Sequence, residues 1–172
     1  MIGTVLLAGL SVACEETPPP SNEPRDPAPD FALARLGVGS QARPVALADY
    51  AGKTVVLDFW ATWCVPCEFQ VPELNAFYDA HRSDSDVALF GVSVDTASPD
   101  IVESWVAEKA VRYPILLDGE ATALEYDLEG YPTVVIVRPD GTIDSRHAGL
   151  IQQSELEEVI QRIRSETRAP AS

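Results

Sequence analysis

The sequence predicts an α/β domain in which helices flank a mixed β-sheet. Two segments rich in β-branched and aromatic residues, 53–60 and 86–95, are separated by a segment of helical character, 64–82. Residues 132–149 have the pattern of a hairpin around a Pro-Asp-Gly turn. Strands that alternate with helices favour parallel pairing, and the hairpin adds antiparallel pairing to the same sheet.

The first predicted elements lie before and around the first long strand. Residues 31–36 and 43–47 are short strand candidates, and we expect them to pair as an N-terminal hairpin around 37–40. The run 53–60 is almost continuously apolar, as expected for a central strand buried on both faces. A helix is expected to follow it and to end near Arg82.

After the second central strand, the sequence predicts an inserted helix and strand. Ser98 and Pro99 supply a cap and a first-turn proline for the inserted helix. The last helix opens with Ser154 and Glu157, which have the spacing of a capping box. The segments expected between these points are a helix at 98–110, a strand at 114–118, a short helix at 120–127 and the hairpin at 132–149.

Charge and composition limit the classes of function. The chain has 172 residues and a formal net charge of −15, from 12 basic and 27 acidic side chains. Nucleic-acid binding needs a basic face to contact phosphates, and none is visible, so we expect no nucleic-acid partner. Three cysteines are too few for a disulfide framework.

An apolar leader opens the chain. Residues 2–13 have the length of a signal-peptide core, too short to span a bilayer, and Ala13 directly precedes Cys14. A leader, a cysteine and a proline-rich segment together resemble a bacterial lipoprotein precursor. That resemblance implies lipidation of Cys14 and a membrane-anchored domain on the periplasmic side. An ordinary cleaved secretion signal and an uncleaved anchor are the alternatives, and each places the domain outside the cytoplasm.

Four regions follow from these patterns. The segment after Cys14 is dense in proline and charge and has nothing apolar to bury, so we expect an extended, flexible tether. From Pro29 onwards the chain contains foldable segments. The expected division is a signal peptide at 1–13, a tether at 14–28, a globular domain at 29–165 and a disordered tail at 166–172.

The segment 55–67, VVLDFWATWCVPC, ends a predicted strand and opens a predicted helix with two cysteines. The N–H groups and partial positive charge of a helix N-terminus stabilise a thiolate. We therefore expect Cys64 to be exposed, to have a depressed pKa and to act as the nucleophile. Cys67, one turn further and more shielded, is placed to resolve a mixed disulfide. Pro66 suits and stiffens the first turn.

Two other readings of the cysteine pair are weaker. A zinc site needs two more ligands, and only His81 and His147 are available, far apart and each alone. A purely structural disulfide that closes so short a loop stabilises little. We therefore predict no metal.

The segment DFWATWCVPC resembles the thioredoxin superfamily, and its surroundings resemble the TlpA/ResA/CcmG-type extracytoplasmic branch. The other matching pieces are APDF, FGVSVD, PILLD, GYPT and the PDGT hairpin, and the similarity covers about 29–163. The resemblance implies a thioredoxin-like fold with an N-terminal β-hairpin and an inserted helix and strand. It also implies that Cys64 and Cys67 form a redox-active disulfide.

The same resemblance implies a substrate-binding surface. Pro132, in GYPT, would be the cis-proline that faces the dithiol, and Tyr131 before it would offer backbone hydrogen bonds to a substrate chain. Trp63, Val65 and Pro66, which surround the cysteines in the sequence, complete the expected surface.

Asp58 interrupts the apolar strand. In thioredoxins of the cytoplasmic type, an aspartate here takes and returns the proton of the second cysteine. The extracytoplasmic branch usually has Asn at this place and a Glu three residues after the second cysteine, where this chain has Gln70, which cannot titrate. We hypothesise that Asp58 is the proton acceptor for Cys67, because burial raises the pKa of a carboxyl group. A purely structural hydrogen-bonding role is the alternative.

The resemblance implies a thiol–disulfide oxidoreductase that reduces disulfides of extracytoplasmic proteins, for example in cytochrome c maturation. We expect no cofactor, a monomer, a disulfide-containing protein substrate and a dithiol electron donor. A thiol peroxidase is one alternative, although such enzymes have Thr or Ser three residues before the reactive cysteine, where this chain has Ala61. A non-catalytic binding or assembly protein is the other.

Overall fold

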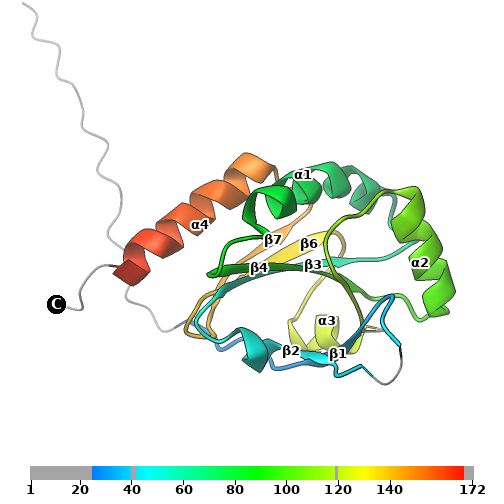
Figure 1. Ribbon diagram of the computed structural model, residues 1–172, viewed down its shortest axis with the longest axis horizontal. Helices are drawn as coiled ribbons and strands as arrows, with labels where there is room; N and C mark the ends of the chain where they lie inside the picture. Colours follow the sequence, from blue (N-terminus) through cyan, green and yellow to red (C-terminus); the bar gives the residue numbers. More distant parts are fainter. Residues whose placement is uncertain (1–24, 40–41, 119, 169–172) are drawn as a thin grey trace, which may run out of the picture.

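A seven-stranded mixed sheet forms the centre of the domain, with α1 and α4 on one face and α3 on the other (Figure 1). The computed structural model describes residues 25–39, 42–118 and 120–168. The strand order is β2-β1-β5-β4-β3-β6-β7. In chain order the elements are β1 (Ala32–Arg35), β2 (Val45–Ala46), the 3₁₀ helix η1 (Leu47–Tyr50), β3 (Thr54–Trp60), α1 (Val65–His81), β4 (Val87–Ser93), α2 (Pro99–Glu108), β5 (Ile115–Leu117), α3 (Ala121–Glu125), β6 (Thr133–Val137), β7 (Ile143–Ala148) and α4 (Gln153–Arg168).

The predicted α/β architecture is confirmed. β3 pairs in parallel with β4 and antiparallel with β6, and all seven of its residues are buried. β1 and β2 form the expected N-terminal hairpin, and α2 with β5 forms the expected insertion after the second central strand. β3 therefore lies between two paired neighbours, as its apolar sequence predicts.

The two faces of β3 pack against different helices. Phe59 contacts Tyr126, which follows α3, with ring centroids 5.5 Å apart. Trp60 points to the opposite face and stacks on Trp105 of α2, with ring centroids 4.2 Å apart. Since side chains alternate along a strand, Asp58 shares the face of Trp60, which is the face that α1 and α2 cover.

Two segment boundaries differ from the prediction. Backbone hydrogen bonds join Asp26 to Ile143 and Ala28 to Gly141, so the end of the predicted tether is part of the fold. α4 begins before the predicted Ser154 and continues to Arg168, so the first three residues of the predicted tail are helical.

The start of α4 has a physical reason. The Gln152 N–H donates to the Glu155 carboxylate at 2.8 Å, whereas Glu157, which we predicted in a capping box, contacts His81 at 2.9 Å.

The predicted signal peptide, Cys14 and most of the tether lie outside the described residues. Within the described ranges, no helix is long and apolar enough to cross a membrane.

Candidate active site

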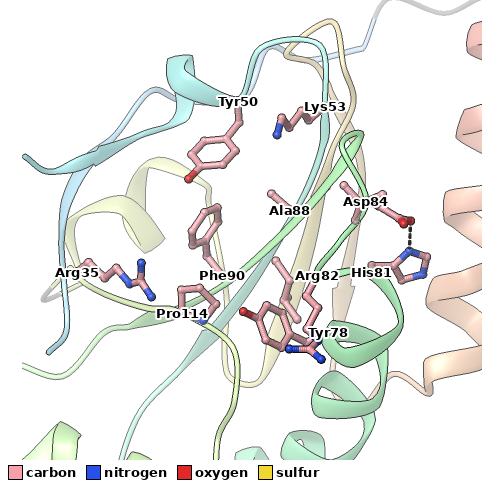
Figure 2. Close-up of a pocket in the computed structure, with 12 residues that line it drawn as sticks. Arg35, Tyr50, Lys53, Tyr78, His81, Arg82, Asp84, Ala88, Phe90 and Pro114 are labelled. Atoms are coloured by element: carbon pink, nitrogen blue, oxygen red, sulfur yellow. Dashed lines mark hydrogen bonds and ion pairs between the residues drawn. The ribbon is translucent and has the colours of Figure 1, made fainter. Parts of the chain in front are cut away.

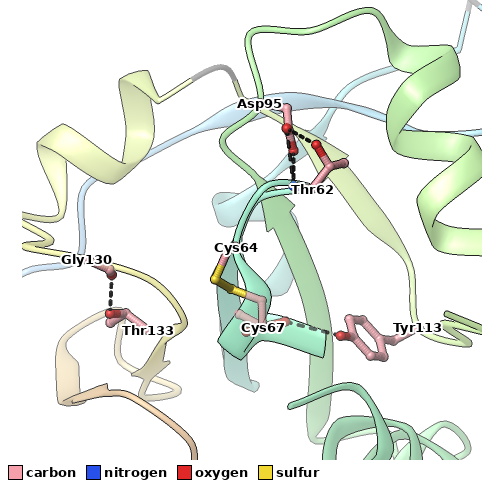
Figure 3. The surroundings of a disulfide bond; sticks show 8 residues. Thr62, Cys64, Cys67, Asp95, Tyr113, Gly130 and Thr133 are labelled. Atoms are coloured by element: carbon pink, nitrogen blue, oxygen red, sulfur yellow. Dashed lines mark hydrogen bonds between the residues drawn. A yellow bond between two sulfur atoms is a disulfide. The ribbon is translucent and has the colours of Figure 1, made fainter. Parts of the chain in front are cut away.

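Cys64 and Cys67 are joined by a disulfide bond at the N-terminus of α1, with their Cα atoms 5.4 Å apart (Figure 3). Cys64 is the N-cap residue of the helix, and Val65 and Pro66 begin its first turn. Cys64 is 5% exposed and Cys67 is 2% exposed. Cys64 is thus less exposed than we predicted, because in this disulfide-bonded form its sulfur is joined to that of the buried Cys67.

The carboxylate of Asp95 fixes the loop that leads to the dithiol. It accepts hydrogen bonds from the Thr62 N–H at 3.0 Å and the Thr62 hydroxyl at 2.6 Å (Figure 3). It also accepts a hydrogen bond from the Ser93 hydroxyl at 2.8 Å. We did not predict this role of Asp95 from the sequence. The sequence did contain a signal for it. Asp95 ends the FGVSVD pattern just after β4, and Thr62 lies just after β3. Because β3 and β4 are parallel neighbours, both residues are at the same edge of the sheet.

The peptide bond between Tyr131 and Pro132 is cis, as the resemblance predicted. This loop is stabilised by a hydrogen bond from the Thr133 hydroxyl to the Gly130 carbonyl at 2.7 Å. In the view of Figure 3, Gly130 and Thr133 lie on one side of the disulfide and Tyr113 lies on the other. In this view the disulfide therefore lies between two parts of the chain that are distant in sequence, the cis-proline loop and Tyr113.

An exposed apolar surface borders the dithiol. Trp63 and Val65 are each 64% exposed and Phe69 is 66% exposed, although the domain buries most other large apolar side chains. We call these three residues the apolar rim. The rings of Trp63 and Tyr131 pack edge to face, with centroids 5.9 Å apart. This contact connects the rim to the cis-proline loop. Contiguous exposed apolar surface is typical of a site that binds another protein.

Phe69 was missing from the predicted surface. Leu74 and Phe77 mark the buried face of α1, and Phe69 does not follow the three- or four-residue spacing that leads to that face. The helical periodicity could therefore have identified it as exposed.

Asp58 is a buried carboxyl group on β3, with 2% exposure. The Tyr113 hydroxyl donates a hydrogen bond to its Oδ2 atom at 3.2 Å, and Oδ1 has no hydrogen-bond partner among the described residues. Figure 3 shows the dashed line of this hydrogen bond leaving the Tyr113 hydroxyl, on the side of Tyr113 that faces Cys67 in this view. Burial raises the pKa of Asp58 to about 7, and the hydrogen bond from Tyr113 offsets part of the rise.

Large side chains pack beside Asp58 because its neighbour in the sheet, Gly91, has no side chain of its own. A Cβ atom at Gly91 would lie 2.6 Å from Ile115 Cδ1 and 2.9 Å from Trp60 Nε1. Large side chains therefore occupy the space above Gly91 and exclude water from the carboxyl group. This exclusion is the physical cause of the raised pKa.

Gln70 is buried and connects α1 to the segment before α4. Its Nε2 atom donates to the Ile151 carbonyl at 2.8 Å, and its Oε1 atom accepts from the Ile151 N–H at 2.9 Å. A glutamate here could accept from the N–H but could not donate to the carbonyl when ionised. The amide is therefore matched to its partner, and a buried residue that cannot titrate occupies this place.

The two histidines take part in other interactions. His81 lies at the far end of α1 between Asp84 and Glu157, and His147 contacts the Leu150 carbonyl. The described part of the chain contains no group of three or more His, Cys, Asp or Glu side chains placed to bind a metal ion.

Known proteins with a similar sequence or structure carry related names. The chain is 33% identical to thiol–disulfide oxidoreductase ResA of Oceanobacillus iheyensis over 134 residues, which covers 77% of this chain and 68% of that protein. It is 30% identical to thioredoxin-like protein YneN of Bacillus subtilis over 131 residues, which covers 76% of this chain and 75% of that protein. The crystal structure of StoA from Bacillus subtilis aligns with a TM-score of 0.64 at 27% identity, covering 76% of this chain and 96% of that one.

These likenesses confirm the predicted resemblance to the ResA-type branch. With the thioredoxin-like fold and the cysteine pair, they define a thiol–disulfide oxidoreductase. The chain belongs to the AhpC/TSA family, which matches residues 24–146.

The raised pKa of Asp58 predicts a pH-dependent loss of stability that Asp58→Asn should remove. The carboxyl group ionises near 3.8 in the unfolded chain and near 7 in the folded chain. Between these values the unfolded state binds fewer protons, so the free energy of unfolding falls as the pH rises, and this fall ends above about pH 7. The shift corresponds to about 4 kcal/mol.

Urea denaturation of the oxidised wild type and the Asp58→Asn variant, at about pH 4 and about pH 8, measures this effect. Between the two conditions, the stability of the variant relative to wild type should rise by about 4 kcal/mol. Other titrating groups are common to both proteins and cancel in the comparison. A difference between the two proteins that does not change with pH would contradict the assignment.

Proposed function

We propose that the protein reduces disulfide bonds of proteins outside the cytoplasm, with Cys64 as the nucleophile and Cys67 as the resolving cysteine. The observation that carries the proposal is the Cys64–Cys67 disulfide at the N-terminus of α1, bordered by the exposed apolar rim. The helix N-terminus favours the thiolate form of Cys64 once the disulfide is reduced.

The reaction is proposed to have two exchange steps. The Cys64 thiolate attacks one sulfur of the substrate disulfide, forming a mixed disulfide, and the other substrate sulfur leaves as a thiolate. The Cys67 thiolate then attacks the Cys64 sulfur, and the second substrate sulfur leaves. Two electrons pass to the substrate, the Cys64–Cys67 disulfide is formed, and a dithiol protein is needed to reduce it again.

Asp58 is proposed to accept the proton that Cys67 loses in the second step. With a pKa near 7, the carboxyl group is about half ionised at neutral pH, so it can both accept and return a proton. A pKa near the working pH is optimal for a general base. The Tyr113 hydrogen bond makes Tyr113 a positioning residue for this carboxyl group. The fixed hydrogen bonds of Gln70 support the view that Asp58 takes the proton-transfer role at this site.

The substrate is proposed to bind across the apolar rim and the cis-proline loop. Trp63 and Val65 offer apolar contact beside the dithiol, and Pro66 limits the motion of the turn between the cysteines. The loop at Tyr131 and Pro132 offers backbone groups to an extended substrate chain. This surface suits many sequences, because backbone pairing and apolar contact select shape rather than particular side chains.

The cellular setting is proposed from the leader sequence and the named relatives. Lipidation of Cys14 would anchor the domain to the membrane on the periplasmic side, through a tether that ends near Asp26. Apocytochrome c is one fitting substrate class, because its paired cysteines must be reduced before haem attachment. A peroxidase role has less support, since Ala61 lies three residues before Cys64 and the neighbouring Thr62 hydroxyl donates to Asp95.

A trapping experiment tests the roles of the two cysteines. The reduced Cys67→Ser variant, incubated with a cyclic peptide closed by one disulfide, should accumulate a covalent complex with the peptide, because the resolving thiol is missing. The Cys64→Ser variant is the matched control and should form little complex. Intact-mass spectrometry measures both, and equal trapping by the two variants would refute the assignment of Cys64 as nucleophile.

Membrane fractionation tests the proposed anchor. Expressed in a bacterium that processes lipoproteins, the full chain should sediment with membranes and gain the mass of attached lipid. Cys14→Ser should lose the lipid mass. A wild-type protein whose mass shows no lipid would exclude lipidation without affecting the assignment of the dithiol.

A further inference from the structure

A pocket lies at the opposite end of α1 from the dithiol. Its volume is about 220 Å³, and its lining includes Tyr78 and Arg82 from the end of α1, together with residues of β4 (Figure 2). Tyr78 follows Cys67 by 11 residues along the helix, a distance of about 16 Å. A molecule bound in this pocket would therefore leave the dithiol free.

The floor of the pocket is an open edge of the sheet. β4 pairs with β5 only over residues 91–93, so the first part of β4, 87–90, has β3 on one side and no strand on the other within the described residues. Pro114 precedes β5 and also lines the pocket. Because proline has no N–H, β5 cannot extend its pairing along this part of β4.

Backbone groups of β4 point into this opening. The Gly91 N–H donates to the Pro114 carbonyl on the open side, whereas the Asp86 carbonyl accepts from β3 on the other side. Backbone direction alternates along a strand, so the N–H and C=O of Val87 and Leu89 point the same way as those of Gly91. Among the described residues, no hydrogen bond satisfies these outward groups, although both residues are buried.

Three basic side chains line the same pocket, which is unusual in a chain with 27 acidic and 12 basic residues. Arg35, Lys53 and Arg82 form no ion pair with any carboxylate in the described ranges. The acidic residue of the lining, Asp84, is already bound to His81 at 2.8 Å and to Arg164 at 2.7 Å. The pocket therefore presents unpaired positive charge beside unpaired backbone groups.

Aromatic side chains form the walls between these charges. Tyr50 and Phe90 pack edge to face with centroids 5.0 Å apart, and Figure 2 shows them between Arg35 and Lys53. Such walls can contact the apolar side chains of a bound segment.

We propose that the open edge of β4 binds an acidic segment of a partner protein in extended conformation. The segment would add to the sheet beside Val87 and Leu89 through backbone hydrogen bonds, and its carboxylates would pair with Arg35, Lys53 and Arg82. A simple anion would use the charges but not the backbone edge, and a neutral strand would use the edge but not the charges. Both features together favour an acidic peptide, and the proposal does not depend on the function of the dithiol.

A binding experiment with a synthetic probe tests the proposal. The probe is a short fluorescein-labelled peptide of alternating glutamate and valine with blocked ends, and fluorescence anisotropy at about 50 mM salt reports its binding to the oxidised full chain. The Arg35→Ala/Arg82→Ala variant should bind at least about tenfold more weakly than wild type. The matched control, Arg43→Ala/Arg112→Ala, removes the same charge outside the pocket and should change the affinity by less than about twofold.

A second probe separates strand addition from simple charge attraction. The same peptide with N-methyl groups on alternate residues keeps its charge but cannot pair with a strand edge, and it should bind at least about tenfold more weakly. The unmodified probe should also slow hydrogen exchange of the Leu89 amide. Equal binding of the two probes, equal binding to the Arg35→Ala/Arg82→Ala variant, or no binding of the acidic probe would each overturn the proposal.

Discussion

The proposed chemistry depends on one carboxyl group, Asp58, which is buried on the face of the sheet that the dithiol helix covers. Asp58 is surrounded by large side chains above Gly91, and its hydrogen bond comes from the neutral hydroxyl of Tyr113 rather than from a cation. A nearby Lys or Arg would lower the pKa of the carboxyl group and keep it ionised. Because burial dominates instead, the group can gain and lose a proton near neutral pH, which proton exchange with a thiol requires.

Around this carboxyl group, the dithiol helix is fixed at two points. Asp95 binds Thr62 in the loop before the helix, and Gln70 binds the backbone of Ile151 within its second turn. These contacts join α1 to β4 and to the segment before α4. The cysteines therefore occupy a rigid position, while the neighbouring apolar rim stays exposed. A fixed cysteine pair beside an exposed apolar surface is consistent with the proposed binding of a protein substrate.

Local sequence patterns predicted the framework and the position of the cysteine pair, but not the partners of the residues around it. The buried strand around Asp58 and the helix that opens at Cys64 follow from short-range patterns, and the cis bond at Pro132 follows from family resemblance. The contact of Tyr113 with Asp58 joins residues 55 positions apart, and that of Gln70 with Ile151 joins residues 81 apart. No periodicity records which distant residues meet, so these contacts required the three-dimensional structure.

The most direct test of the account follows the pH dependence of the second exchange step. The wild type and Asp58→Asn are mixed in reduced form with a substrate disulfide, and the rate of Cys64–Cys67 disulfide formation from the mixed disulfide is measured by stopped flow. The account predicts a wild-type rate that rises with a midpoint near pH 7, and a variant slower by about 100-fold at neutral pH whose profile lacks this midpoint. Superimposable profiles for the two proteins would contradict it.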